Sequence, residues 1–291
     1  MIYDVRQTAA YSYASTVAYA HHVLRLTPID RVGQRVQAAA LDIAPVPVKR
    51  REGRDFFGNR LTWIDLAEPH DRMVIKVAAR IAVESADELS PDATPAWEAV
   101  RDEVFASNDV GASAPAHFLF ASRLVSLDPE IRDYVRESFA PGRPILAGAV
   151  DLNRRIKADF TYEIGATTVT TTPPMSFALR RGVCQDFAHI MIAGLRGIAL
   201  PAAYVSGYLR TGNAAAPGLQ GADAMHAWVW VWCGKEAGWR GLDPTNAVLA
   251  REDHVVVAVG RDYSDVAPID GVVFVSGGQR LDVAVSVTPV G

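Results

Sequence analysis

Residues 181–195 read RGVCQDFAHIMIAGL, in which a glycine precedes a cysteine by two residues and apolar residues then recur at helical spacing. The residues at i, i+4, i+7 and i+11, from Cys184 to Leu195, form one stripe of a helix that should be largely buried. The thiol of Cys184 then lies in the first helical turn, where unpaired backbone N–H groups and the positive end of the helix dipole favour a thiolate. This stretch therefore predicts a cysteine nucleophile, and the rest of the chain has to supply a base, an orienting group and a fold.

The sequence offers one base and one carboxylate for this thiol. Residues 225–233 read MHAWVWVWC, a strand whose period of two puts His226 on one face and Cys233 on the other, so Cys233 is most simply a core residue. A glycine-rich turn then brings the chain back as an antiparallel strand that ends at Asp243, near the strand end where His226 lies. Alone, an aspartate before a proline is a turn former, but across a hairpin from His226 it becomes a carboxylate that holds the imidazole. Cys184, His226 and Asp243 then supply nucleophile, base and orienting group.

Composition excludes several classes of function. The 291 residues, 49% of them hydrophobic and 21% charged, are those of a soluble globular protein with one large domain or two ordinary ones. A formal net charge of −4 provides no basic face for nucleic acid. No apolar run approaches the roughly 20 residues that span a bilayer. Because the N-terminus has neither a basic start nor an apolar segment, we expect no secretory signal, a cytoplasmic protein, and neither nucleic acid nor membrane as a partner.

Cysteine and histidine usage argues against a metal site. The chain has two cysteines and no CxxC motif, so neither a disulfide scaffold nor a structural zinc site is expected. His21 and His22 are neighbours, and neighbouring side chains on a strand point to opposite faces and cannot chelate one ion. We therefore predict no metal and no cofactor.

The pattern changes along the chain from strands to helices. Residues 1–85 read as short alternating strands and predict an antiparallel, sandwich-like β region. Near residue 86 turn and helix-cap signals begin, with Asp128 as one predicted cap, and residues 86–291 are predicted to form the catalytic domain. Within it, the threonine-heavy residues 161–172 are expected to be β-rich. Residues 253–290 alternate valines with Gly and Pro turns and are expected to complete the sheet behind the candidate site.

Charged residues and a loop surround the candidate thiol. Arg180 and Arg181 lie just upstream of Cys184 and could raise its thiolate fraction, although solvated positions are the simpler interpretation. Asp186 suits the start of a helix, yet its charge opposes a thiolate, and helical spacing should turn it away from the sulfur. Residues 211–223 are rich in Gly, Ala and Pro and are expected to form a loop at the substrate entrance.

Four blocks of the sequence resemble the bacterial transglutaminase-like superfamily, whose members are papain-like α+β proteins often described as cysteine proteases. The blocks are GVCQDFAH at residues 182–189, YVSGY at 204–208, HAW at 226–228 and LDPT at 242–245. The similarity extends to DFFGN at residues 55–59, similar to the family's N-terminal β region, and to HVVVAVGRDY at 254–263, similar to its final strands. The resemblance implies an antiparallel β domain followed by a papain-like core of helices on an antiparallel sheet, with Cys184, His226 and Asp243 as the triad.

The chemistry implied by this triad is acyl transfer through a thioester. The sulfur of Cys184 attacks an amide carbonyl of a peptide or protein substrate, His226 serves the proton transfers, and water completes the hydrolysis. The oxyanion is expected to be held by the Cys184 N–H and one further donor, for which Gln185, Tyr204 and Trp228 are the candidates.

Hydrolysis is favoured over crosslinking, because crosslinking also needs a site that excludes water and admits a second substrate. Transamidation, or amine acyl transfer from a small thioester donor as in the arylamine acetyltransferases, is the alternative enzymatic function. An alternative of a different class is a non-catalytic binding module that keeps the fold. A replaced triad residue would favour that alternative, and none is replaced.

Overall fold

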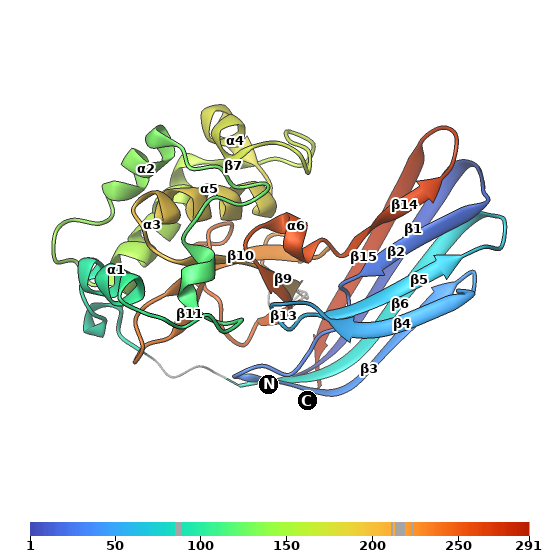
Figure 1. Ribbon diagram of the computed structural model, residues 1–291, viewed down its shortest axis with the longest axis horizontal. Coiled ribbons are helices and arrows are strands. Elements are labelled where there is room, and N and C mark those ends of the chain that lie inside the picture. The colour runs from blue at the N-terminus through green and yellow to red at the C-terminus, as the bar shows by residue number, and fades with distance from the viewer. Residues whose placement is uncertain (85–88, 211, 213–218, 223, 291) are drawn as a thin grey trace.

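Two antiparallel sheets, with strand orders β15-β1-β6-β3 and β14-β2-β5-β4, pack face to face at one end of the molecule (Figure 1). The computed structural model describes residues 1–84, 89–210, 212, 219–222 and 224–290. The first six strands are β1 (Ile2–Val17), β2 (Tyr19–Leu24), β3 (Gln34–Ala44), β4 (Lys49–Arg54), β5 (Arg60–Leu66) and β6 (His70–Val83). Alternate residues of β1 and β6 are buried, as a period of two predicts, and they share a hydrophobic core with β2 and β5. The predicted N-terminal antiparallel β region is therefore confirmed.

The last two strands of the chain belong to these same sheets. β14 (Ile269–Phe274) pairs with β2, and β15 (Gln279–Pro289) pairs with β1. The expectation that residues 253–290 complete the sheet behind the candidate site is wrong for these two strands, and it holds for β13 (His254–Gly260). Alternating valines indicate that a strand forms, but the free edges of β1 and β2, distant in the sequence, determine which strand it pairs with. The predicted catalytic domain, residues 86–291, thus contributes its last two strands to the N-terminal sandwich.

A third antiparallel sheet, of order β12-β11-β10-β9-β13, carries the main helices (Figure 1). Its other strands are β9 (Ala202–Leu209), β10 (His226–Trp232), β11 (Trp239–Asp243) and β12 (Val248–Leu249). The helices are α1 (Trp97–Phe105), α2 (Pro129–Arg136), α3 (Ile145–Asp159), α4 (Pro173–Leu179), α5 (Cys184–Gly197) and α6 (Tyr263–Val266), with short 3₁₀ helices η1 (Pro91–Ala93) and η2 (Pro115–Phe118). The central helix α5 is buried along nearly its whole length and packs against Val229 and Val231 of β10. The predicted α+β class, with helices on an antiparallel sheet, is confirmed.

One predicted cap agrees with the structure, whereas a predicted β-rich stretch does not. Asp128 holds the start of α2, where its carboxylate accepts backbone N–H groups of the first turn. Within residues 161–172 only the first two form a strand. The short strands here are β7 (Thr161–Tyr162) and β8 (Arg181–Gly182), which pair with each other. The threonines that follow lie in turns, and the N–H of Thr168 donates to the hydroxyl of Thr171 at 2.9 Å. The branched side chain of threonine favours a strand, but its hydroxyl can also stabilise a turn.

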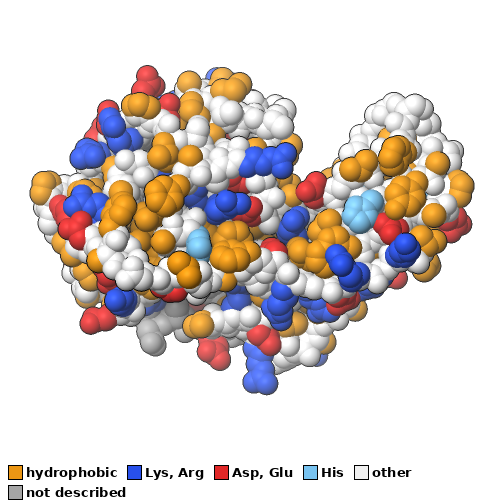
Figure 2. All heavy atoms as spheres, in the orientation of Figure 1, with side chains coloured by type: hydrophobic (Ala, Val, Ile, Leu, Met, Phe, Trp, Pro, Cys, Tyr) orange, Lys and Arg blue, Asp and Glu red, His pale blue; other side chains and the backbone are white. Residues whose placement is uncertain are grey.

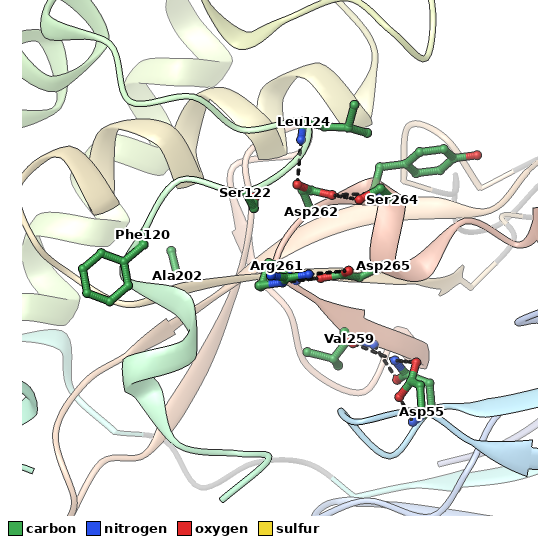
Figure 3. A network of polar contacts seen from close by, with 12 residues as sticks. Asp55, Phe120, Ser122, Leu124, Ala202, Val259, Arg261, Asp262, Ser264 and Asp265 are labelled. Atoms are coloured by element: carbon green, nitrogen blue, oxygen red, sulfur yellow. Dashed lines mark hydrogen bonds and ion pairs between the residues drawn. The ribbon is translucent and has the colours of Figure 1, made fainter. Parts of the chain in front are cut away.

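Two buried amide side chains fasten the sandwich to the outer edge of β13. This strand is the last of its sheet, so its outward N–H and C=O groups have no partner strand among those described. Asn59 accepts from the N–H of Val259 at 2.8 Å and donates to its C=O at 2.7 Å, and Gln34 makes the same two bonds with Val256 at 2.8 Å each. Figure 3 shows Asp55 beside Val259, and the Asp55 carboxylate accepts from Asn59 Nδ2 at 2.8 Å. The two amides take the place of a strand and fix the sandwich relative to the third sheet.

A further network holds the segment after β13 against the helices (Figure 3). The carboxylate of Asp262 accepts from the backbone N–H groups of Ser264 and Leu124, both at 2.8 Å, and caps α6. The guanidinium of Arg196 is buried near the end of α5 and donates to the carbonyl oxygens of Phe120, Ala202 and Arg261. A buried guanidinium that is bonded in this way joins α5, β9 and the segment leading to α6.

Candidate active site

Helix α5 begins at Cys184, as predicted, and the carboxylate of Asp186 closes its first turn. Asp186 accepts from the N–H of Val183 at 2.8 Å and from the hydroxyl of Thr167 at 2.6 Å. A Cβ atom on Gly182 would lie 2.5 Å from this carboxylate, so the tight approach needs a glycine. The carboxylate of Asp186, whose charge was expected to oppose a thiolate, is therefore hydrogen-bonded to the backbone at the start of the helix. Burial raises its pKa.

His226 and Asp243 meet where their hairpin opens. The register of β10 and β11 sets Val229 opposite Leu242, and Nε2 of His226 lies 3.0 Å from Oδ2 of Asp243, with both side chains fully buried. Burial opposes a charged imidazole, but the charges of Asp243 and Cys184 outweigh it and raise the pKa of His226 to about 10. Burial also opposes the carboxylate, yet the charge of His226 holds the pKa of Asp243 well below its usual range. The two groups form a buried, hydrogen-bonded pair in which each favours the charged form of the other.

The turn after β11 orients the carboxylate of Asp243. Its Oδ1 accepts from the backbone N–H of Thr245 at 3.0 Å and of Asn246 at 3.3 Å, and its Oδ2 accepts from Nδ2 of Asn246 at 2.7 Å. Asn246 also accepts from the N–H of Gln220 at 2.9 Å and donates to its C=O at 3.2 Å. Asn246 therefore joins the candidate carboxylate to the segment that precedes β10, a role that the sequence analysis missed.

Cys184 and His226 line one cavity of about 290 Å³. Because Asp243 occupies Nε2 of His226, Nδ1 is the nitrogen left for the thiol, and it is buried without a hydrogen bond to any described residue. Gly221, with φ at +88°, lies against it, since a Cβ atom there would stand 2.7 Å from Nδ1. The entrance loop expected over residues 211–223 falls mainly outside the described residues, and Gly221 belongs to its described end.

A second imidazole, which the sequence analysis did not identify, shares the same carboxylate. Nε2 of His254 lies 3.3 Å from Oδ2 of Asp243, and its ring packs edge-on against Trp228 at 5.2 Å between centroids. His254 is the first residue of β13, as His226 is of β10, and both strands pair with β9. Because β10 and β13 flank β9 and run in the same direction, their first residues, His226 and His254, lie at the same end of the sheet. This proximity follows from the strand order, which the sequence does not give.

The three candidates for the second oxyanion donor are separated by their positions. Gln185 and Tyr204 line the cavity with Cys184. Nε2 of Gln185 donates to the C=O of Val169 at 3.1 Å, whereas burial, and then the charge of Cys184, raise the pKa of Tyr204 far above its usual value. Trp228 does not line this cavity, and its ring stacks on His226 from the protein interior, so it is no longer a candidate.

The two arginines before the thiol have other partners. The guanidinium of Arg180 lies 4.0 Å from the ring centroid of Phe177 and 4.8 Å from that of Phe160. Arg181 is exposed and forms an ion pair with Glu163 at 3.5 Å. Stacking on aromatic faces and pairing at the surface agree with the simpler interpretation, in which neither cation acts on the thiol.

Two further properties concern the described part of the chain. None of its helices is long and apolar enough to cross a membrane. Within the same residues no three His, Cys, Asp or Glu side chains are grouped as metal ligands would be. Cytoplasmic location and independence from a metal or cofactor stay predictions.

Two family models match this chain. Residues 3–82 match the bacterial transglutaminase-like N-terminal region, and residues 132–244 match the transglutaminase-like superfamily. The first match lies on the sandwich, and the second ends one residue after Asp243 and contains Cys184 and His226.

Whole-length relatives and a solved structure extend this similarity. An uncharacterized protein of Mycobacterium tuberculosis is 38% identical, over 99% of this chain and 92% of its own length. An uncharacterized protein of Mycobacterium leprae is 30% identical, over 98% and 97%. A crystal structure from Cytophaga hutchinsonii, provisionally named a cysteine protease, superimposes with a TM-score of 0.76 at 20% identity and covers 100% of this chain and 92% of that one. At this identity the structural likeness concerns the fold.

Proposed function

The chain belongs to the transglutaminase-like superfamily, and from this premise we propose that it is a cysteine-dependent amide hydrolase with Cys184 as nucleophile, His226 as base and Asp243 as orienting carboxylate. The observation that carries the proposal is the buried contact of 3.0 Å between His226 and Asp243, beside the cavity that holds the Cys184 thiol at the start of α5. A carboxylate in this place keeps one imidazole nitrogen occupied and turns the other toward the nucleophile.

The reaction begins with the thiol proton of Cys184 already on Nδ1 of His226, so that a thiolate faces an imidazolium. The thiolate attacks the carbonyl carbon of the amide, and the oxyanion is held by the Cys184 N–H and by the side chain of Gln185 or Tyr204. The imidazolium then gives its proton to the departing amine, the C–N bond breaks, and a thioester remains. Water, deprotonated by His226, attacks the thioester and releases the acid and the thiol. The raised pKa of His226 supports this sequence, because it stabilises the imidazolium that two of the steps require.

Alkylation tests the nucleophile, and the chain contains its own control. Iodoacetamide at neutral pH should label Cys184 and spare Cys233, which is fully buried and whose pKa burial raises to about 12. His226→Gln should suppress the labelling of Cys184, because the thiol loses its base. Equal and slow labelling of both thiols, unchanged by His226→Gln, would instead support a binding module without catalysis.

Product analysis then separates hydrolysis from acyl transfer. Incubation of the protein with a glutamine-containing peptide, with and without an added primary amine, is followed by mass spectrometry. We expect the hydrolysed product in both samples and none with Cys184→Ala. A dominant amine adduct would show that an amine outcompetes water at the thioester, and the enzyme would then be a transferase.

A further inference from the structure

The inner face of the long strand β1 meets three different surfaces along its length. Near its start, Tyr3 and Val5 pack against β9 and β13 of the third sheet. Toward its end, residues 13–17 enter the core of the sandwich. The inner residues between these two contacts line the cavity that holds the candidate thiol and imidazole; they are Gln7, Ala9 and Tyr11. The sandwich therefore builds part of the candidate active site, and Figure 2 shows the surface hollowed between the two units.

Strand β15 widens this face by direct cross-strand pairing. Leu281 is paired with Tyr11, and Val283 with Ala9, and all four line the cavity. Paired residues of an antiparallel ladder place their side chains on one face, so the four form a continuous apolar surface. Leu281 is 47% exposed and Val283 39%, although both are hydrophobic, so the described chain leaves this surface partly uncovered. We call these four residues the β1–β15 wall.

Apart from Cys184 and His226, the described lining of the cavity carries no charged side chain. No Asp, Glu, Lys or Arg is among its described lining residues, and apart from the thiol and His226 its ionisable groups are tyrosines. Burial raises the pKa of Tyr11 to about 12, so this phenol is neutral at physiological pH. A charged substrate side chain that lay against the β1–β15 wall would lose water and find no counter-charge there, whereas an apolar one would be stabilised by leaving water. The volume of about 290 Å³ lies near the lower end of ligand sites, which suits a side chain and its adjoining amide.

We propose that the β1–β15 wall is a specificity subsite, which selects a peptide or protein substrate with an uncharged, hydrophobic side chain next to the amide that Cys184 attacks. The inference rests on the proposed function, since it assumes that Cys184 is the nucleophile. The proposal gives the sandwich a role in substrate recognition. It also gives a role to the pairing of β15 with β1, because β15 supplies two of the four residues of the wall.

Peptide electrophiles test the subsite without knowledge of the natural substrate. The probes are N-acetyl-glycyl-Xaa chloromethyl ketones, in which Leu, Lys or Asp at Xaa adjoins the reactive group, and iodoacetamide is the reference without a side chain. The second-order rate of Cys184 modification is followed by mass spectrometry. In the wild type the Leu probe should react about tenfold faster than the Lys and Asp probes. Equal rates for the three probes, with iodoacetamide still reactive, would overturn the subsite and leave the proposed function standing. An inert thiol toward iodoacetamide would overturn the proposed function itself.

A pair of neighbouring substitutions locates the effect on the wall. With each rate divided by the iodoacetamide rate of the same protein, Val283→Asp should slow the Leu probe about tenfold and accelerate the Lys probe. Ala284→Asp is the matched control, because it adds the same charge one residue further along β15. Ala284 pairs with Thr8 and lies on the exposed face of the sheet, away from the cavity, so this variant should change none of the rates. If Val283→Asp does not fold, Leu281→Lys at the more exposed position should favour the Asp probe. An unchanged order of the three probes in the folded variant contradicts the proposal.

Discussion

At the scale of single residues, the carboxylate of Asp243 is the centre of the candidate site. It accepts from two imidazoles, one side-chain amide and two backbone N–H groups. Of the two imidazoles, His226 lines the cavity with the thiol and His254 does not. We therefore expect His226 to exchange protons and His254 to hold Asp243 in place as a positioning residue.

This division of roles predicts different consequences for two substitutions of His254. His254→Leu removes an N–H donor to a buried charge and should lower the rate of Cys184 alkylation roughly tenfold. His254→Gln keeps an N–H donor and should recover part of that rate. His21→Leu is the control, because His21 is an exposed histidine that also pairs with an aspartate, Asp65 at 2.6 Å, far from the thiol in the fold. A wild-type rate in His254→Leu would remove His254 from the site.

Gly221 offers a second prediction, with a matched glycine elsewhere. Gly221→Ala and Gly165→Ala both place a side chain at φ +88°, so both should lose about 1–2 kcal/mol of unfolding free energy. At Gly165 no atom lies within 4 Å of the new Cβ, whereas at Gly221 it would collide with Nδ1 of His226. Only Gly221→Ala should slow Cys184 alkylation, roughly ten- to a hundredfold, because it displaces the imidazole. Equal alkylation rates in the two variants would show that Gly221 does not position His226.

At the scale of elements, β13 connects the two halves of the molecule. It pairs with β9 on one edge, while Gln34 and Asn59 of the sandwich bind its other edge. It also begins with His254, so the element that fastens the sandwich carries part of the support for the candidate triad. Side-chain amides can satisfy an edge without extending the sheet, which leaves the sandwich free to be a separate pair of layers.

Removal of one amide should therefore cost more than an ordinary surface change. Asn59→Ala leaves the N–H and C=O of Val259 buried without their partners, and we expect a loss of about 2–4 kcal/mol of unfolding free energy. Asn108→Ala changes the same residue type at an exposed position and should stay within about 0.5 kcal/mol of the wild type. Urea unfolding measures both. Similar losses in the two variants would mean that water replaces the Asn59 contacts.

At the scale of the whole molecule, buried histidines in the sandwich and in the helices determine how the free energy of unfolding changes in acid. Burial lowers the pKa of His22 in the sandwich and of His189 in α5 to about 4. Unfolded histidines bind protons below about pH 6.5, so between pH 6.5 and 4 the unfolded chain binds more protons than the folded one. The unfolding free energy should therefore fall as the pH falls through this range. The raised pKa of His226 acts in the opposite sense: its contribution is full below pH 6.5 and is lost as the pH rises toward 10.

Substitution of His22 tests the acid response. Neither ring nitrogen of His22 is hydrogen-bonded to a described residue, and the side chain is buried. His22→Gln removes the titrating group, so the loss of unfolding free energy between pH 7 and pH 5, measured in urea, should be smaller than in the wild type. His21→Gln removes only the neighbouring charge, a smaller cause of the lowered pKa of His22 than burial, so its slope should stay closer to the wild type than that of His22→Gln. Identical slopes in all three proteins would show that His22 does not set the acid limb.

The amino-acid sequence by itself determined the local structures and the residue types of the candidate site. A glycine before Cys184, helical spacing after it, and strict alternation from His226 to Cys233 are short-range patterns, and the structure has α5 and β10 at these positions. The hairpin that brings Asp243 back to His226 is also local, because its two strands adjoin in the chain. Patterns of this kind depend on backbone geometry over a few residues, which a single sequence contains.

Only the tertiary structure decided the contacts between distant segments. The second imidazole of His254, the return of β14 and β15 to the sandwich, and the wall that β1 lends to the cavity all depend on strand order. Alternation indicates that a strand has one buried face, but many edges can satisfy its hydrogen bonds, and the edge chosen is the one that leaves the fewest groups unpaired in the complete fold.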